Sequence, residues 1–241
     1  MLIANAISIE LMTAPIIDNL SFQIARGECL CFVGPSGCGK TTVLRAIAEL
    51  QTLKNGSISH DFQRLAFLFQ EPRLLPWRNA LENVAIVAPE RQAEIAPLLQ
   101  RLGFSASDFA KYPHELSGGM RQRIALARAL IIEPDLLLMD EPFSALDHQL
   151  RRQLQQLIAE KISAGMAVCL VTHDRDEAVL LGSCILRLDG KPATALQSLH
   201  LDMPYAARDE AWIRRQVQSP FFAHIRSGEE IPLLSDAEDK S

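Results

Sequence analysis

The most specific chemical pattern in this sequence is a glycine-rich loop that lies between an apolar run and a helical pattern. It reads G-P-S-G-C-G-K-T and matches the pattern G-x-x-x-x-G-K-[ST]. Glycine lets backbone N–H groups converge on phosphate oxygens, and the N-terminus of the following helix favours negative charge. Lys40 can reach the β- and γ-phosphates of a nucleotide, and the Thr41 hydroxyl can bind Mg²⁺. The loop therefore predicts a phosphate site that contains Gly34, Pro35, Ser36, Gly37, Cys38, Gly39, Lys40, Thr41 and Thr42.

A second pattern is an apolar run, residues 136–139, that ends in two acids. Asp140 at the end of a buried strand can hold Mg²⁺ through water, opposite the phosphate loop. Glu141 follows one residue later, where it can polarise an attacking water as a general base. An isolated Asp-Glu pair would more simply be a surface feature. Together with the phosphate loop, the pair indicates a P-loop NTPase.

A third pattern, L-S-G-G-M-R-Q-R at residues 116–123, continues into an amphipathic helix that reaches residue 130. Ser117, Gly118 and Gly119 place a hydroxyl and bare backbone amides at a helix start, which is a second phosphate-binding surface. A plain helix N-cap would explain Ser117 but not the whole string. One chain has no use for two distant γ-phosphate sites, whereas two chains arranged head to tail do, because each surface then closes on the other chain's nucleotide.

These three motifs resemble those of ABC-type nucleotide-binding subunits, and the resemblance covers about residues 2–190. It implies ATP and Mg²⁺ as cofactors, ATP hydrolysis, and a homodimer. It also implies that Gln70 senses the γ-phosphate and Mg²⁺, that Asp147 crosses the dimer interface, and that His173 contacts the γ-phosphate. The implied catalytic residues are Glu141, His173 and Gln70; the implied metal contacts are Thr41, Gln70 and Asp140; the implied contacts to the partner's nucleotide are Ser117, Gly118, Gly119 and Gln122.

One position departs from the family pattern. The family usually has an aromatic residue that stacks on adenine, and that place falls at about Leu11 or Met12. Neither is aromatic, so we expect an apolar contact with adenine that is weaker than stacking.

The segment F-Q-E-P-R-L-L-P-W, residues 69–77, with L-E-N-V at 81–84, resembles the nitrate/sulfonate/taurine branch of bacterial importers. That branch handles small anions or, in some cases, thiamine-precursor pyrimidines. The resemblance implies integral-membrane permease subunits, an indirect external solute-binding protein, and a peripheral location at the cytoplasmic face of the cell membrane. Leu75, Pro76 and Trp77 would anchor a permease helix. Trp77 could instead pack within the helical lobe.

Composition agrees with a cytoplasmic protein of this kind. The 241 residues are 48% hydrophobic and carry a net charge of −5, which argues against a basic footprint for nucleic acid. The apolar stretches are far shorter than the roughly 20 residues of a membrane-spanning helix. The apolar start, residues 1–9, is expected to form an edge strand rather than a signal peptide. Five cysteines without a CxxC pair indicate reduced thiols: Cys29, Cys31, Cys38, Cys169 and Cys184.

The elements that must position these residues alternate between strands and helices, which predicts an α/β fold. Strands are expected at 28–33, 56–59, 64–69, 135–139, 167–172 and 184–188, and helices at 40–50, 148–163 and 174–181. The expected architecture is an ABC-type P-loop NTPase core with a mostly parallel sheet, an N-terminal antiparallel β part and an inserted α-helical subdomain. The nucleotide-binding domain is predicted to span residues 1–192, with the helical subdomain at about 75–130. A C-terminal extension would span 193–241, with a weakly ordered end from residue 228.

Two rival functions remain open. A soluble ABC ATPase in DNA repair or translation would typically carry tandem cassettes, coiled-coil arms or a basic surface. A non-hydrolysing subunit paired with an active homologue is suggested by the missing aromatic residue. Stoichiometric nucleic-acid binding would favour the first, and failure to bind ATP would favour the second.

Overall fold

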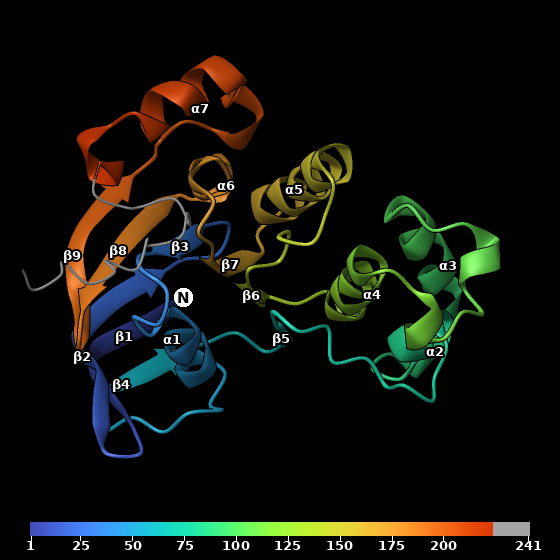
Figure 1. The fold of residues 1–241 in the computed structure, drawn as a ribbon, viewed down its shortest axis with the longest axis horizontal. Coiled ribbons are helices and arrows are strands. Elements are labelled where there is room, and N and C mark those ends of the chain that lie inside the picture. Colours follow the sequence, from blue (N-terminus) through green and yellow to red (C-terminus); the bar gives the residue numbers. More distant parts are fainter. Residues whose placement is uncertain (224–241) are drawn as a thin grey trace, which may run out of the picture.

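The computed structural model describes residues 1–223, so the predicted weakly ordered end, residues 228–241, lies outside the described range. Within that range, nine strands form one sheet in the order β4-β1-β2-β9-β8-β3-β7-β6-β5 (Figure 1). No helix in the described part is long and apolar enough to span a bilayer. The strands are β1 (Leu2–Leu11), β2 (Ala14–Ile24), β3 (Cys29–Val33), β4 (Asn55–His60), β5 (Leu65–Leu68), β6 (Leu136–Asp140), β7 (Ala167–Val171), β8 (Cys184–Gly190) and β9 (Ala193–His200).

The half of the sheet from β8 to β5 is parallel throughout. Strands β3, β6 and β7 are buried at every residue. Alternate residues enter two separate cores: Cys31 packs in the cluster that holds Ile158 of α5, and Phe32 packs in the cluster that holds Val43 of α1. Because helices cover both faces of the sheet, these strands are continuous apolar runs without alternation. Helix α1 is Lys40–Ile47 and α5 is His148–Ser163.

The N-terminal strands form the antiparallel part. Strand β1 pairs with β2 on one side and with β4 on the other, where Leu2 lies opposite His60. The expectation of an edge strand at residues 1–9 is therefore wrong, because β4 returns along the chain to cover that edge. The edge strand is β4 itself, which is largely exposed.

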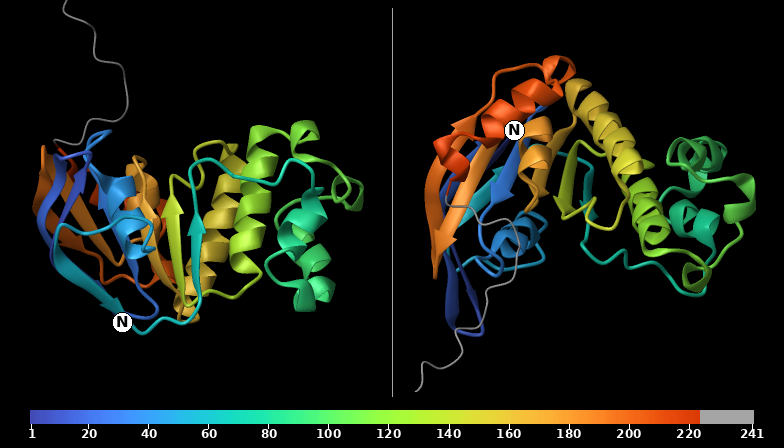
Figure 2. Two further views of the ribbon diagram at one scale, coloured as in Figure 1. Left: turned by 90° about the horizontal axis from the view of Figure 1, so that it is seen from below. Right: turned by 45° about the horizontal axis from the view of Figure 1, so that its top comes forward.

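A helical lobe projects from the β5–β6 end of the sheet, as both views in Figure 2 show. It contains α2 (Ala80–Ala85), α3 (Gln92–Arg101) and α4 (Gly118–Leu130). Helix α2 begins at a capping box in which Asn79 and Glu82 exchange side-chain and backbone hydrogen bonds. Helix α4 packs against both α2 and β5 and so joins the lobe to the core.

Beyond residue 192 the chain stays with the sheet. Strand β9 pairs antiparallel with β8, and α7 (Glu210–Val217) packs on α6 (Arg175–Leu181). Arg208 is only 7% exposed, and its guanidinium donates to the carbonyls of Val179, Leu180 and Gly182 at 2.9, 3.0 and 2.7 Å. The C-terminal carbonyls of α6 lack intrahelical donors, so one cation satisfies several of them. The domain boundary at residue 192 stays a prediction.

Replacing Arg208 by Ala should lower the free energy of unfolding by about 3 kcal/mol, because charge-assisted hydrogen bonds are lost and buried carbonyls remain unpaired. Denaturant titration would measure this loss. Arg214→Ala is the control: its side chain is 78% exposed. We expect that variant to change stability by less than about 0.5 kcal/mol. Equal stability of both variants would contradict the role given to Arg208.

Candidate functional site

The phosphate loop lies between β3 and α1, as its sequence predicts. Lys40 is 8% exposed, and its Nζ donates to the carbonyls of Gly34 and Pro35 at 2.8 Å each. The ammonium therefore links the end of the loop to its first two residues. Gly39 is the N-cap of α1 and supplies no side-chain cap, so the first backbone N–H groups of α1 have no side-chain partner. That arrangement suits an anion at the helix start.

At two positions of the loop only glycine fits, because a side chain would collide with a neighbouring strand. A Cβ on Gly34 would lie 2.2 Å from the carbonyl oxygen of Leu188. Gly39 has φ +102°, and a Cβ there would lie 2.7 Å from Ile16 Cγ2. The loop is thus pressed against β8 on one side and β2 on the other, which holds its backbone in place.

The predicted metal contacts Thr41 and Asp140 meet beside the loop. Thr41 Oγ1 donates to Asp140 Oδ1 at 3.1 Å. Asp140 ends β6 and is 3% exposed, and burial raises the pKa of its carboxyl. Hydroxyl and carboxylate oxygens are hard ligands of the kind that Mg²⁺ prefers, so the residues present fit that ion.

The three predicted catalytic residues come together on neighbouring strands. Gln70 Nε2 donates to Glu141 Oε2 at 3.2 Å, and His173 Nδ1 lies 3.5 Å from the same oxygen. Gln70 follows β5, Glu141 follows β6 and His173 follows β7, and these strands are adjacent and parallel. The carboxyl ends of parallel strands meet at one edge of a sheet, which is where ligands of such folds bind.

Glu141 has an unusual backbone. Its φ is +47°, in the left-handed region that residues other than glycine rarely adopt. Its N–H donates to the carbonyl of Val171 at 2.9 Å, which fixes this turn against β7. Strain of this kind persists where surrounding structure imposes it, and it commonly accompanies functional sites. The carboxylate of this residue contacts Gln70 and His173.

The second predicted phosphate surface lies in the helical lobe, and no hydrogen bond in residues 1–223 joins it to the phosphate loop. Ser117 is the N-cap of α4, and its hydroxyl accepts from Met120 N–H at 3.2 Å. Ser117 and Gly118 are exposed, and Gly119 is half-buried. Gln122 differs: it is 5% exposed. Its place on α4 turns the side chain toward the protein. The expected contact of Gln122 with a partner's nucleotide stays a prediction.

The segment after Glu141 adjoins this surface. A Cβ on Gly119 would lie 3.0 Å from the carbonyl oxygen of Ala145 and 3.2 Å from Leu146 Cδ2, so α4 starts against these two residues. Asp147 is exposed and caps α5 by accepting from Leu150 N–H at 3.0 Å. Its predicted place at a dimer interface stays a prediction.

At the place of the missing aromatic residue, β1 turns into β2. Met12 is fully exposed and Leu11 is 38% exposed. Both side chains are free to contact a base, but neither provides a ring face.

Comparison with known proteins decides the family. The sequence profile described as ABC transporter matches residues 17–144, which is more than half of the chain. The chain belongs to the ABC transporter family. The matched part contains the phosphate loop, Gln70, the 116–123 motif and the Asp140–Glu141 pair.

Several curated members of the family are similar over most of this ABC chain. The aliphatic sulfonates import ATP-binding protein SsuB 2 of Burkholderia lata is 44% identical over 199 residues, which is 78% of this chain and 72% of that protein. The taurine import ATP-binding protein TauB of Pseudomonas aeruginosa is 39% identical over 229 residues, 88% of this chain and 86% of that protein.

A solved structure also matches. It is a dimeric post-hydrolysis state of an ATP-binding cassette bound to ADP and Pi, with a TM-score of 0.76, 27% identity, 84% of this chain covered and 100% of that chain covered. The predicted fold class is confirmed.

Several side chains that were not predicted from the sequence support the site of this ABC chain through hydrogen bonds to the segments around it. Arg128 on α4 donates to the carbonyls of Pro72 and Arg73 at 3.0 and 3.1 Å, which ties the 116–123 helix to the segment after Gln70. Thr172, just before His173, and Glu177 in the first turn of α6 are both buried. The spacing Asp174-x-x-Glu177 is typical of a capping box and would place the glutamate near the surface. Only the packing of α5, α6 and α7 reveals that it is buried.

Proposed function

We propose that this chain is the ATP-hydrolysing subunit of a bacterial ABC importer for a small solute, working as a homodimer on separate permease subunits. The observation that supports hydrolysis most directly is the convergence of Gln70 and His173 on one oxygen of Glu141, at the edge that also holds Lys40 and the Thr41–Asp140 pair. The curated relatives are named for the import of aliphatic sulfonates and taurine, so small sulfonates are the solutes to test first. Nitrate and thiamine-precursor pyrimidines remain alternatives.

In the proposed cycle, residues 34–42 hold the phosphates of ATP. Thr41, Asp140 and Gln70 would hold Mg²⁺, which neutralises phosphate charge when it is bound. The Gln70 amide donates from Nε2 to Glu141, which leaves its Oε1 free as a ligand oxygen. Glu141 takes the proton of the attacking water, and His173 stabilises charge at the γ-phosphate.

Closure of two chains supplies the remaining donors. Ser117, Gly118 and Gly119 of one chain would cover the γ-phosphate held by the other, and Asp147 would lie at the interface. Dimerisation is expected because Ser117, Gly118 and Gly119 lie at the start of α4 in the helical lobe, and that lobe lies away from α1 and the phosphate loop of the same chain (Figure 1). Hydrolysis removes the bridging phosphate and so loosens the closed dimer.

The surface around Trp77 is the proposed contact with the permease, at the cytoplasmic face of the membrane. Trp77 is 69% exposed, which argues against packing within the helical lobe, and Ile86 and Val87 are 48% and 44% exposed. Fully buried Asn83 accepts from Leu75 N–H at 2.8 Å and donates to the Arg78 carbonyl at 2.9 Å, so the segment is rigid although exposed. Exposed apolar side chains on a well-fixed segment are suited to contact with a partner helix.

Affinity purification of the tagged chain from detergent-solubilised native membranes tests the transport assignment. We expect a polytopic permease in about equal amount, and Trp77→Ala should reduce its recovery about tenfold or more, as truncation of an aromatic anchor does. Leu50→Ala, at another exposed apolar residue (59%) after α1, is the control. A soluble homodimer without a membrane partner, or one that binds nucleic acid, would favour the soluble ABC ATPase instead.

A further inference from the structure

His173 is not held in place by its own side chain. That side chain is 59% exposed, and its Nδ1 lies 3.5 Å from Glu141 Oε2. The position of the imidazole therefore depends on the backbone of the residues on either side of it, Thr172 and Asp174.

Those two residues are fixed by a short network. The Asp174 N–H donates to Thr172 Oγ1 at 3.0 Å, and the Thr172 hydroxyl donates to Glu177 Oε2. The Glu177 N–H donates back to Asp174 Oδ1 at 3.1 Å, and Arg151 on α5 pairs with Asp174 Oδ2 at 3.2 Å. The loop is thus tied to the first turn of α6 and to α5.

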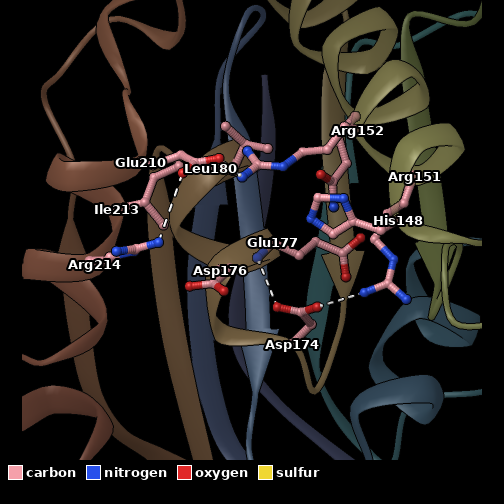
Figure 3. A pocket seen from close by; sticks show the side chains of 11 residues that line it. His148, Arg151, Arg152, Asp174, Asp176, Glu177, Leu180, Glu210, Ile213 and Arg214 are labelled. Atoms are coloured by element: carbon pink, nitrogen blue, oxygen red, sulfur yellow. Dashed lines mark hydrogen bonds and ion pairs between the residues drawn. The ribbon is translucent and has the colours of Figure 1, made fainter.

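Glu177 is an unexpected residue for this place. It is 4% exposed and lies near buried Gln155 of α5. Its second oxygen, Oε1, has no hydrogen bond of ordinary geometry within residues 1–223. In Figure 3 the side chain extends from α6 toward the α5 residues His148 and Arg151. It borders a cavity of about 410 Å³ between α5, α6 and α7. A buried carboxyl with an unpaired oxygen costs stability, and a residue that only filled space would be apolar.

We propose that Glu177 is a positioning residue for ATP hydrolysis: through the Thr172 hydroxyl it holds the backbone on both sides of His173, and so keeps the imidazole within reach of Glu141. The inference rests on the proposed function, because it takes His173 as a γ-phosphate contact. Glu177 itself touches neither nucleotide nor water in the reaction.

The protonation state of the Glu177 carboxyl allows a second test, the pH dependence of kcat. Burial raises the pKa of Glu177 to about 8, so the group is mostly uncharged at neutral pH. Ionisation would add a buried negative charge next to that of Asp174 and would loosen the start of α6. The charged groups that border the cavity are His148, Arg151 and Arg152 on α5, Asp174 and Asp176 at the start of α6, and Glu210 and Arg214 on α7.

The test uses the full-length chain and measures kcat, KM for MgATP and ATP affinity. Glu177→Leu and Thr172→Val should each lower kcat about tenfold or more, since small misplacement of a catalytic group is costly. ATP affinity should change less than about threefold, because the phosphate loop is untouched. The double variant should be no slower than either single variant, because both changes break one link.

Glu177→Gln should rescue kcat at neutral pH, because its carbonyl oxygen accepts the same hydrogen bond from Thr172. The ratio of wild-type to Glu177→Gln kcat should fall as pH rises through about 8, since only the wild type ionises there. Asp176→Asn is the matched control, since it alters an exposed acid one residue away on the same cavity. We expect it to leave kcat unchanged.

Unchanged kcat in Glu177→Leu or Thr172→Val, multiplicative losses in the double variant, or no rescue by Gln would overturn the inference. If the Leu variant does not fold, Thr172→Val and the pH ratio of Glu177→Gln decide it. A wild-type chain that fails to hydrolyse ATP would overturn the proposed function itself. An active wild type with a normal Glu177→Leu variant overturns this inference alone.

Discussion

Glu141→Gln is expected to bind ATP normally, to dimerise, and to hydrolyse ATP about a hundredfold more slowly or worse. The amide keeps the shape of the side chain and can still accept from Gln70, whose Nε2 lies 3.2 Å from Glu141 Oε2. It cannot take a proton from water, so the step that separates the two chains is blocked while binding is retained. Phosphate release and sedimentation with and without MgATP would measure both properties.

The control for this experiment is Glu90→Gln, which makes the same chemical change at an exposed residue of the helical lobe. Its turnover should match that of the wild type. Near-normal turnover in Glu141→Gln would remove Glu141 from the role of general base and would leave Asp140 and His173 to explain hydrolysis.

Two inactive variants should restore activity when they are mixed. Lys40→Ala removes the ammonium that closes the phosphate loop, and Ser117→Phe blocks the exposed start of α4, so each homodimer has two broken sites. In a head-to-tail dimer, a Lys40→Ala chain paired with a Ser117→Phe chain has one site with both defects and one site with neither. Random exchange puts such a dimer in about half of the population. ATP turnover should therefore reappear in the mixture.

The matched control carries both substitutions on one chain and is mixed with wild type. Each mixed dimer then has one defect in each site, so turnover should come from wild-type homodimers alone. If the mixture of the two single variants shows no ATP turnover although both variants are folded, the two phosphate surfaces do not act across a dimer. Rates would be followed by phosphate release at several mixing ratios.

Much of the site could be predicted because its parts are local in the chain. The phosphate loop is a continuous run whose glycines, lysine and threonine act through their own backbone and the adjoining helix start, so residue type and spacing are sufficient. The buried strands β3, β6 and β7 were equally plain, because a parallel strand covered on both faces must be apolar throughout. The ends of these three strands differ from the predicted bounds by one residue at most.

Other features depended on partners far away in the sequence. The start of the chain has the pattern of a strand, but whether it lies at an edge was decided by β4, about fifty residues later. The amphipathic pattern of α4 did not show that Gln122 turns inward, because that depends on the helix rotation imposed by the helices and strands packed around it. Strand β9 and the role of Arg208 could not be predicted for the same reason. Strand β9 pairs with β8, and Arg208 donates to carbonyls at the end of α6.

Residue types and their spacing were enough to predict the chemistry: a phosphate site, two acids after a buried strand, and membership of an ABC-type family. Which of these groups meet depends on the tertiary fold. Gln70, Glu141 and His173 are separated by about seventy and thirty residues along the chain, and only the order β5-β6-β7 places their side chains together. The tertiary fold also placed the Glu177 carboxyl where it accepts from the Thr172 hydroxyl, one residue before His173. That carboxyl borders a cavity between α5, α6 and α7, which no local pattern connects. Spacing encodes local backbone geometry, whereas contacts across a sheet depend on its strand order and on the packing of its helices.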